Sequence, residues 1–208
     1  MTRRSVKLDD RCLLFFVKNP EKGKVKSRLA AVIGEDSAVR LYKNLVAQML
    51  TTSKEGTFPF YICFFPKNAQ KSVKNWLGRE YDYIPQNGKD LGERMRNGFI
   101  DGFTMGYKRV VLIGSDLPDL PLGFIRDAFA SLRKKDVVIG PAYDGGYYLI
   151  GFKQKTFFPQ VFQGIAWGTK NVFDETMKKL RRFTRAVYTL PYLRDIDTAE
   201  DLKGVSPF

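Results

Sequence analysis

Lysine and arginine residues are concentrated in the segment KNPEKGKVKSRL, residues 18–29 of the 208-residue chain. It follows an apolar run and leads into a predicted helix. Backbone N–H groups and the positive end of a helix attract anions at such a place, and Lys and Arg side chains add countercharge. The segment therefore indicates a phosphate-binding loop, with a basic surface loop as the alternative. It is not a Walker A loop, because Val25 follows Gly23-Lys24 where Ser or Thr is required.

Residues 86–95, QNGKDLGERM, form a second polar segment. Asp90 stands at the N-cap position of a predicted helix, and Glu93 completes the spacing of a capping box. The sequence favours neither of two alternative roles for Asp90, a structural helix cap and a ligand contact. Arg94 falls in the first helical turn, where a cation opposes the helix dipole, so it is better suited to an anion or a partner carboxylate.

Carboxylates suited to a hard metal ion occur in two distant segments. Asp116 follows the most apolar strand, predicted over 109–114, and could bind Mg²⁺ or Mn²⁺ that bridges phosphate oxygens. The alternative is that Asp116 caps the following turn. Asp197, in the segment 194–202, could supply a second carboxylate or, like Thr198, cap the last helix.

The triplet Asp-Gly-Gly at residues 144–146 separates two predicted strands. Asp-Gly is a strong signal for a tight turn, and a turn alone would explain it. Adjacent glycines also let a ligand approach the backbone. Tyr147, Tyr148 and Trp167 could then stack on a ring of that ligand.

Short apolar runs that alternate with amphipathic stretches must position these segments. We predict strands over 12–17, 58–65, 81–84, 109–114, 136–139, 147–152 and 186–190. We predict helices over 26–50, broken at Gly34, and over 68–77, 90–105, 123–132, 169–180 and 199–203. This alternation predicts a single α/β domain with a mainly parallel sheet flanked by helices, and such sheets bind ligands at the carboxyl ends of their strands.

The amino-acid composition excludes several kinds of catalytic and metal-binding site. The chain has no histidine, which excludes a Ser-His-Asp triad, an imidazole base and His-ligated zinc. Its formal charge of +13 favours anionic partners, although a solvated basic surface is the alternative. Cys12 and Cys63 lie in apolar runs, as buried thiols of a reducing compartment would. We expect a cytoplasmic protein, with peripheral membrane contact through basic patches left open.

Taken in order, five motifs resemble the bacterial DUF2064 proteins, the family A or "transferase 1" glycosyltransferases of the nucleotide-diphospho-sugar transferase superfamily. The motifs are Lys18–Leu29, Gln86–Met95, Gly114–Pro118, Gly140–Gly151 and Asp195–Leu202. The resemblance spans residues 12–202. The chain is also similar, more distantly, to 2-phospholactate guanylyltransferases and molybdenum-cofactor nucleotidyltransferases.

The resemblance implies a GT-A-like Rossmannoid fold, a single domain over 1–208 with its core at about 12–202. It implies Mg²⁺ or Mn²⁺ at Asp116, with Asp197 favoured over Asp195 as the second ligand. Together with the patterns above, it assigns nucleotide or phosphate binding to Lys18, Gly23, Lys26, Arg28, Gln86, Gly88, Asp90 and Arg94. It assigns sugar or acceptor binding to Asp144, Gly145, Gly146, Tyr147 and Trp167.

These assignments predict a metal-dependent transferase that moves the sugar of a nucleotide-diphosphate sugar to an unidentified acceptor. Asp116 and Asp144 are the candidate catalytic residues, and Asp144 is the candidate base because histidine is absent. A nucleotidyltransferase that joins an NTP to a phosphorylated acceptor, with pyrophosphate as product, is the close alternative. A basic nucleic-acid-binding module is less favoured, since no RRM, KH, zinc-finger or helix-turn-helix pattern occurs.

Overall fold

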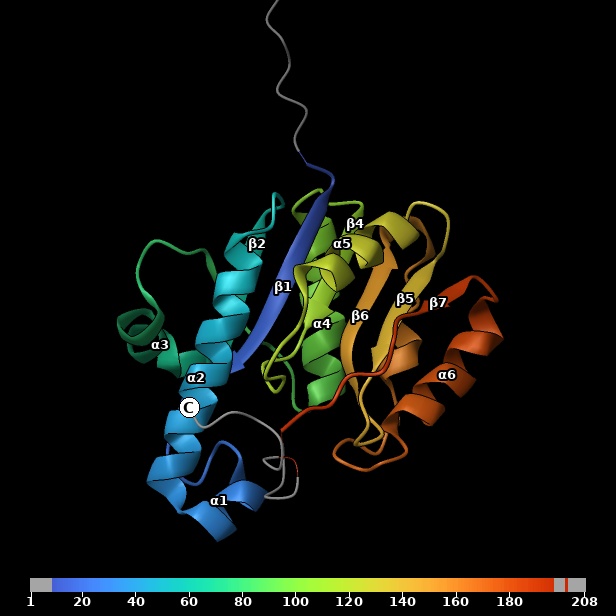
Figure 1. Cartoon of the computed structure of the whole chain (residues 1–208). Coiled ribbons are helices and arrows are strands. Elements are labelled where there is room, and N and C mark those ends of the chain that lie inside the picture. The colour runs from blue at the N-terminus through green and yellow to red at the C-terminus, as the bar shows by residue number, and fades with distance from the viewer. Residues whose placement is uncertain (1–8, 197–200, 202–208) are drawn as a thin grey trace, which may run out of the picture.

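A seven-stranded sheet forms the centre of the computed structural model, which describes residues 9–196 and 201. The strands are β1 (Arg11–Lys18), β2 (Phe60–Phe65), β3 (Tyr83–Pro85), β4 (Arg109–Ile113), β5 (Val137–Pro141), β6 (Tyr147–Lys153) and β7 (Val187–Thr189). Their order across the sheet is β3-β2-β1-β4-β6-β5-β7 (Figure 1). Only β6 runs antiparallel to its neighbours, so the mainly parallel α/β sheet predicted from the sequence is confirmed.

Helices connect the strands and cover both faces of the sheet. The α-helices are α1 (Ser27–Ile33), α2 (Glu35–Lys54), α3 (Gln70–Leu77), α4 (Leu91–Thr104), α5 (Leu122–Ser131) and α6 (Val172–Phe183). Short 3₁₀ helices occur at η1 (Lys67–Ala69), η2 (Gln154–Thr156) and η3 (Pro159–Phe162). Gly34, with a positive φ of 83°, separates α1 from α2 as predicted.

The core has two layers because successive side chains of a strand point to opposite faces. Leu13, Phe15 and Val17 of β1 pack on the face covered by α2 and α5. Cys12, Leu14 and Phe16 pack on the opposite face, with residues of α4 and α6. Burial on both faces accounts for the unbroken apolar run of β1.

Several predicted boundaries differ from the structure by a few residues. Helix α6 begins at Val172 rather than at Thr169. The Thr169 hydroxyl donates to the Ala166 carbonyl oxygen at 2.9 Å, and this bond holds the preceding residues in a turn. The predicted last turn over 199–203 falls largely outside the described residues. None of the described helices combines the length and the apolar character needed to cross a membrane.

The segment after β7 crosses the carboxyl ends of the sheet (Figure 1). Leu193 forms a parallel bridge with Ala142, next to the end of β5. Farther along, the Ile196 N–H donates to the Asp116 carbonyl oxygen at 3.1 Å. The Ile196 side chain is fully buried in a small cluster with Leu29 of α1. This crossing brings residues 194–196 to the loop after β4.

Candidate functional site

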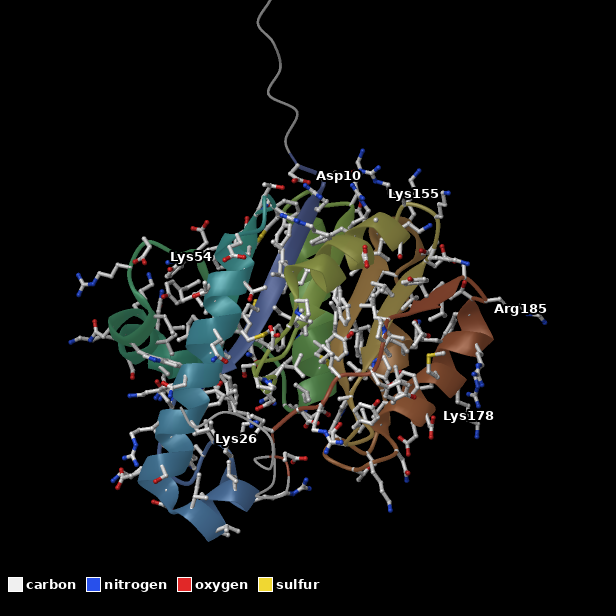
Figure 2. The ribbon with its side chains drawn as sticks, in the orientation of Figure 1. Asp10, Lys26, Lys54, Lys155, Lys178 and Arg185 are labelled. Carbon is white, nitrogen blue, oxygen red and sulfur yellow. The ribbon has the colours of Figure 1, made fainter. Side chains whose placement is uncertain are left out.

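A cavity of about 830 Å³ opens at the carboxyl ends of β1 and β4. All five polar segments of the sequence contribute to its wall. Lys26 marks this end of the sheet, and Asp10 marks the opposite end (Figure 2). The polar and aromatic residues that line the cavity are Phe16, Lys18, Lys26, Ser27, Arg28, Tyr42, Gln86, Arg94, Ser115, Asp116, Asp144, Tyr147, Tyr148, Trp167, Thr169, Lys170 and Asp195.

Lys26 is the buried cation of the cavity. Its side chain is only 2% exposed, and its ammonium group pairs with the Asp116 carboxylate and donates to the Ile196 carbonyl oxygen. The Lys26 backbone has a φ of 48°, which makes it the one residue other than glycine with a positive φ among those described. This conformation is uncommon for a residue with a side chain and frequently marks a functional constraint.

The other residues of the first basic segment either line the cavity or lie outside its wall. Lys18 and Arg28 line the cavity, and Arg28 donates to the Gly168 carbonyl oxygen at 3.3 Å. Gly23 lies outside the cavity wall, with a positive φ of 70°. Lys22 pairs with Asp36 at 2.7 Å on the surface. The structure thus brings three of the four residues assigned from this segment to the cavity.

Tyr42 of α2 ties the ends of β1 and β4 together. Its hydroxyl oxygen accepts from the Lys18 backbone N–H at 2.8 Å and lies 3.1 Å from the Ser115 hydroxyl. Burial raises the pKa of Tyr42, and the nearby Asp116 charge adds to the rise, so the phenol stays protonated. The sequence pattern does not mark Tyr42 as a site residue, because its contact with Ser115 joins positions 73 residues apart.

Asp195 is a third carboxylate on the cavity wall, beside Asp116 and Asp144. Burial first, and then the charge of Asp144, raise the pKa of Asp195 to about 7; Asp116 adds to the rise and Lys26 opposes it. The family resemblance implies Asp197 rather than Asp195 as the second metal ligand. Asp197 lies outside the described residues, whereas Asp195 of the same motif lines the cavity.

The carboxylates are of the type that a hard divalent cation prefers. Within the described part of the chain, no three His, Cys, Asp or Glu side chains are grouped closely enough to hold a metal by themselves. Mg²⁺ is commonly bound by one or two carboxylates together with substrate phosphates and water. Asp116, Asp144 and Asp195 bring carboxylate oxygens to one cavity wall, so these residues would fit Mg²⁺ or Mn²⁺ that is also held by substrate phosphates and water.

Gln86 and Arg94 of the second segment also line the cavity. The Gln86 amide donates to the carbonyl oxygens of Cys63 at 2.7 Å and Val17 at 3.3 Å, which fixes it between β1 and β2. The Arg94 guanidinium lies 4.2 Å from the centroid of the Phe65 ring. Its buried Nε has no hydrogen-bond partner, and burial lowers the pKa of Arg94. An anion in the cavity would satisfy this donor.

Asp90 and Gly88 lie outside the cavity wall. The Asp90 carboxylate accepts from the Glu93 N–H at 2.8 Å, and the Glu93 carboxylate accepts from the Lys89 N–H at 2.9 Å. The first bond is the N-cap contact that the spacing predicts, whereas the return bond from Glu93 goes to Lys89, the residue before the cap, and not to the Asp90 N–H of a regular capping box. Gly88 has a φ of 144°, and a Cβ there would lie 2.7 Å from the Arg94 backbone nitrogen.

The Asp-Gly-Gly triplet is both a turn and part of the cavity wall. The Asp144 carboxylate accepts from the Gly146 N–H at 2.7 Å, and both residues line the cavity. Gly145 does not line it, because its backbone packs against the start of α6. A Cβ at Gly145 would lie 2.0 Å from the Lys170 carbonyl oxygen. Across the cavity wall, the rings of Tyr147 and Trp167 meet edge to face at 6.5 Å.

The fold is that of the GT-A and nucleotidyltransferase class, and the cavity lies at the strand ends where such folds bind ligands. The chain belongs to the DUF2064 family. The family model, described as "Uncharacterized protein conserved in bacteria (DUF2064)", matches residues 45–169.

Solved structures have the same fold. A "putative nucleotide-diphospho-sugar transferase" from Desulfovibrio desulfuricans G20 is 43% identical, with 96% of this chain and 90% of that chain covered and a TM-score of 0.89. A 4-diphosphocytidyl-2C-methyl-D-erythritol synthase from Anaerococcus prevotii DSM 20548 is 11% identical, with 94% and 96% covered and a TM-score of 0.58.

The manganese complex of Rv0371C from Mycobacterium tuberculosis H37Rv is 12% identical, with 93% and 96% covered and a TM-score of 0.55. These last two likenesses establish the fold alone. A search of curated proteins finds no match.

Proposed function

We propose that the protein is a metal-dependent transferase that binds a nucleotide-diphosphate sugar and transfers its sugar to an acceptor. The observation that carries the proposal is the cavity itself, where Lys18, Lys26 and Arg28 approach the carboxylates Asp116 and Asp144 at the carboxyl ends of the sheet. The name of the 43% identical protein from Desulfovibrio desulfuricans supports the same substrate class.

The cations suit the diphosphate of the donor. When the bond between the anomeric carbon and the phosphate oxygen breaks, negative charge develops on the departing nucleoside diphosphate. Lys18, Lys26 and Arg28 would neutralise that charge from fixed positions. Arg94, with its unpartnered Nε, offers a further donor. Mg²⁺ or Mn²⁺ at Asp116, with Asp195 or Asp197 as second carboxylate, would supply additional charge stabilisation.

Asp144 suits the acceptor side. The acceptor oxygen forms the new bond to the anomeric carbon and loses its proton, so the reaction needs a base or an orienting acceptor group there. The Asp144 carboxylate is held by the Gly146 N–H, in a turn that packs against the start of α6. A rigid carboxylate of this kind can orient an acceptor hydroxyl and receive its proton.

Nucleotidyl transfer is the second candidate. The same cavity could bind an NTP, and attack by a phosphorylated acceptor on the α-phosphate would release pyrophosphate. The number of cations on the cavity wall favours this alternative, because a triphosphate carries more charge than the diphosphate of a nucleotide sugar; they are Lys18, Lys26, Arg28, Arg94 and Lys170. The fold likeness to 4-diphosphocytidyl-2C-methyl-D-erythritol synthase is compatible with it.

A product assay separates the two reactions. The protein is first screened for thermal stabilisation by nucleotides and nucleotide sugars, with and without Mn²⁺. The stabilising compounds are then incubated with protein and cell-extract acceptors, and products are separated by ion exchange. Release of a nucleoside diphosphate from a nucleotide sugar is the expected result. Pyrophosphate from an NTP, without nucleoside diphosphate from any nucleotide sugar, would replace the first proposal by the second.

A further inference from the structure

Aromatic side chains gather on the surface beside the cavity, outside its wall. The rings of Tyr143 and Tyr192 are 5.4 Å apart and tilted by 42°, and the ring of Phe173 meets Tyr192 edge to face at 6.1 Å. The Arg194 guanidinium lies 5.6 Å from the centroid of the Tyr143 ring. Tyr143 is 66% exposed and Tyr192 is 49% exposed. We call these four residues the aromatic platform.

The platform is continuous with the cavity along three chain segments. Tyr143 directly precedes Asp144, and Arg194 directly precedes Asp195. Phe173 directly follows Val172 at the start of α6, and each of these neighbours lines the cavity. The Tyr143 N–H donates to the Leu193 carbonyl oxygen at 3.1 Å, and the Phe173 N–H donates to Gly145 at 2.8 Å. Backbone bonds therefore fix the platform relative to the two carboxylates.

We propose that the aromatic platform binds the pyranose ring of a carbohydrate acceptor. This inference rests on the proposed glycosyl transfer and adds the acceptor's chemical class. A sugar ring presents a flat face of C–H groups, which packs on an aromatic face, and hydroxyls at its edge. The two phenol hydroxyls and the Arg194 guanidinium can bond to those hydroxyls. An acceptor seated here would reach the cavity on the side of Asp144, the residue proposed to receive its proton.

Binding of neutral sugars tests the proposal without a known acceptor. The protein is labelled with 3-fluorotyrosine, and the ¹⁹F signals of Tyr143, Tyr192 and Tyr188 are assigned from single Tyr→Phe variants. The methyl glycosides of glucose, galactose, mannose and N-acetylglucosamine are titrated separately, with glycerol as a polyol that has no ring face. Tyr188, 39% exposed on β7, is the matched control.

We expect saturable shifts of the Tyr143 and Tyr192 signals with at least one glycoside, none with glycerol and none at Tyr188. The double variant Y143A/Y192A should lower the affinity for that glycoside about tenfold or more, and Y188A should leave it unchanged. The absence of a saturable shift with every glycoside would overturn the proposal. Shifts that depend only on protein concentration would also overturn it, in favour of a contact between two copies of the chain.

Nucleotide titrations of the same samples keep the two proposals separate. If nucleoside diphosphates perturb the protein and no glycoside does, the aromatic platform is refuted and the proposed function stands. If a glycoside binds and no nucleotide does, the carbohydrate site stands and the transferase proposal is refuted.

Discussion

Asp9 and Asp136, at the amino ends of strands, are paired with cations, whereas only Asp116 of the three aspartates on the cavity wall at the carboxyl ends forms a salt bridge among the described residues. At the amino ends, Asp9 pairs with Arg11 at 2.8 Å and Asp136 pairs with Lys153 at 3.1 Å. The Arg11 hydrogen bond lowers the pKa of Asp9. Burial pushes the pKa of Asp136 up, but hydrogen bonds from Thr184 and Lys153 outweigh it and the net pKa is lowered.

The cavity shows the opposite behaviour for the same residue type. Asp195 shares its surroundings with Asp116 and Asp144, and burial with this repulsion raises its pKa to about 7. Charges that are matched within the protein contribute to stability, whereas charges left unmatched cost stability and suit a ligand. The contrast supports the proposal that ligands bind at the carboxyl ends of the sheet.

The largest effect is expected at Lys26, the buried cation of the cavity. Lys26→Met removes the partner of Asp116 and the donor to the Ile196 carbonyl oxygen. We expect nucleotide affinity to fall at least tenfold and the free energy of unfolding to fall by about 1–3 kcal/mol. Titration calorimetry and urea denaturation measure the two quantities. Lys24→Met, an exposed change two residues away, is the matched control, and equal affinities in the two variants would refute the role of Lys26.

A smaller effect, seen as a pH dependence, is expected at Asp195. Its folded pKa of about 7 lies above the ordinary value of 3.8, so the folded state binds the additional proton between these pH values. The free energy of unfolding of the metal-free protein should therefore fall as pH rises from about 4 to 7. In Asp195→Asn the free energy of unfolding should fall by about 1–2 kcal/mol less over this pH range. The difference is modest because partial exposure to solvent screens the repulsion. Urea denaturation in EDTA measures it, and identical pH profiles would contradict the prediction.

The smallest effect is expected at Asp136, where the free energy of unfolding should depend on pH in the direction opposite to that at Asp195. Its lowered pKa means that its stabilisation is present above pH 4 and is lost as pH falls through the folded pKa. Asp136→Asn should reduce the free energy of unfolding by about 1 kcal/mol at pH 7 and by less at pH 3. Denaturation at the two pH values checks this. A larger loss at pH 3 than at pH 7 would remove the contrast between the two ends of the sheet.

The sequence predicted the features that depend on neighbouring residues. Apolar runs located every strand, Gly34 located the break between α1 and α2, and Asp90 was correctly predicted as the N-cap of α4. Ligands were expected at the carboxyl ends of the strands, where the motifs occur. Most of the assigned residues do line one cavity there.

The features that escaped prediction depend on contacts between distant residues. The pairing of Lys26 with Asp116 and Ile196 joins chain segments up to 170 residues apart. Tyr42 had the pattern of an ordinary core residue of α2, and only the fold brings it to Ser115. Asp195 and Asp197 share one motif, and only the path of the segment across the sheet brings Asp195 to the cavity wall.

Titration calorimetry of nucleoside diphosphates with and without Mn²⁺, on the wild type and on Asp116→Asn, tests the central claim most directly. The wild type should bind a nucleoside diphosphate more tightly with Mn²⁺ than without it. Asp116→Asn should abolish that difference while the protein stays folded by circular dichroism. Binding that is unaffected by Mn²⁺ in both proteins, with equal affinities, would contradict a metal-assisted diphosphate site at the carboxyl end of β4.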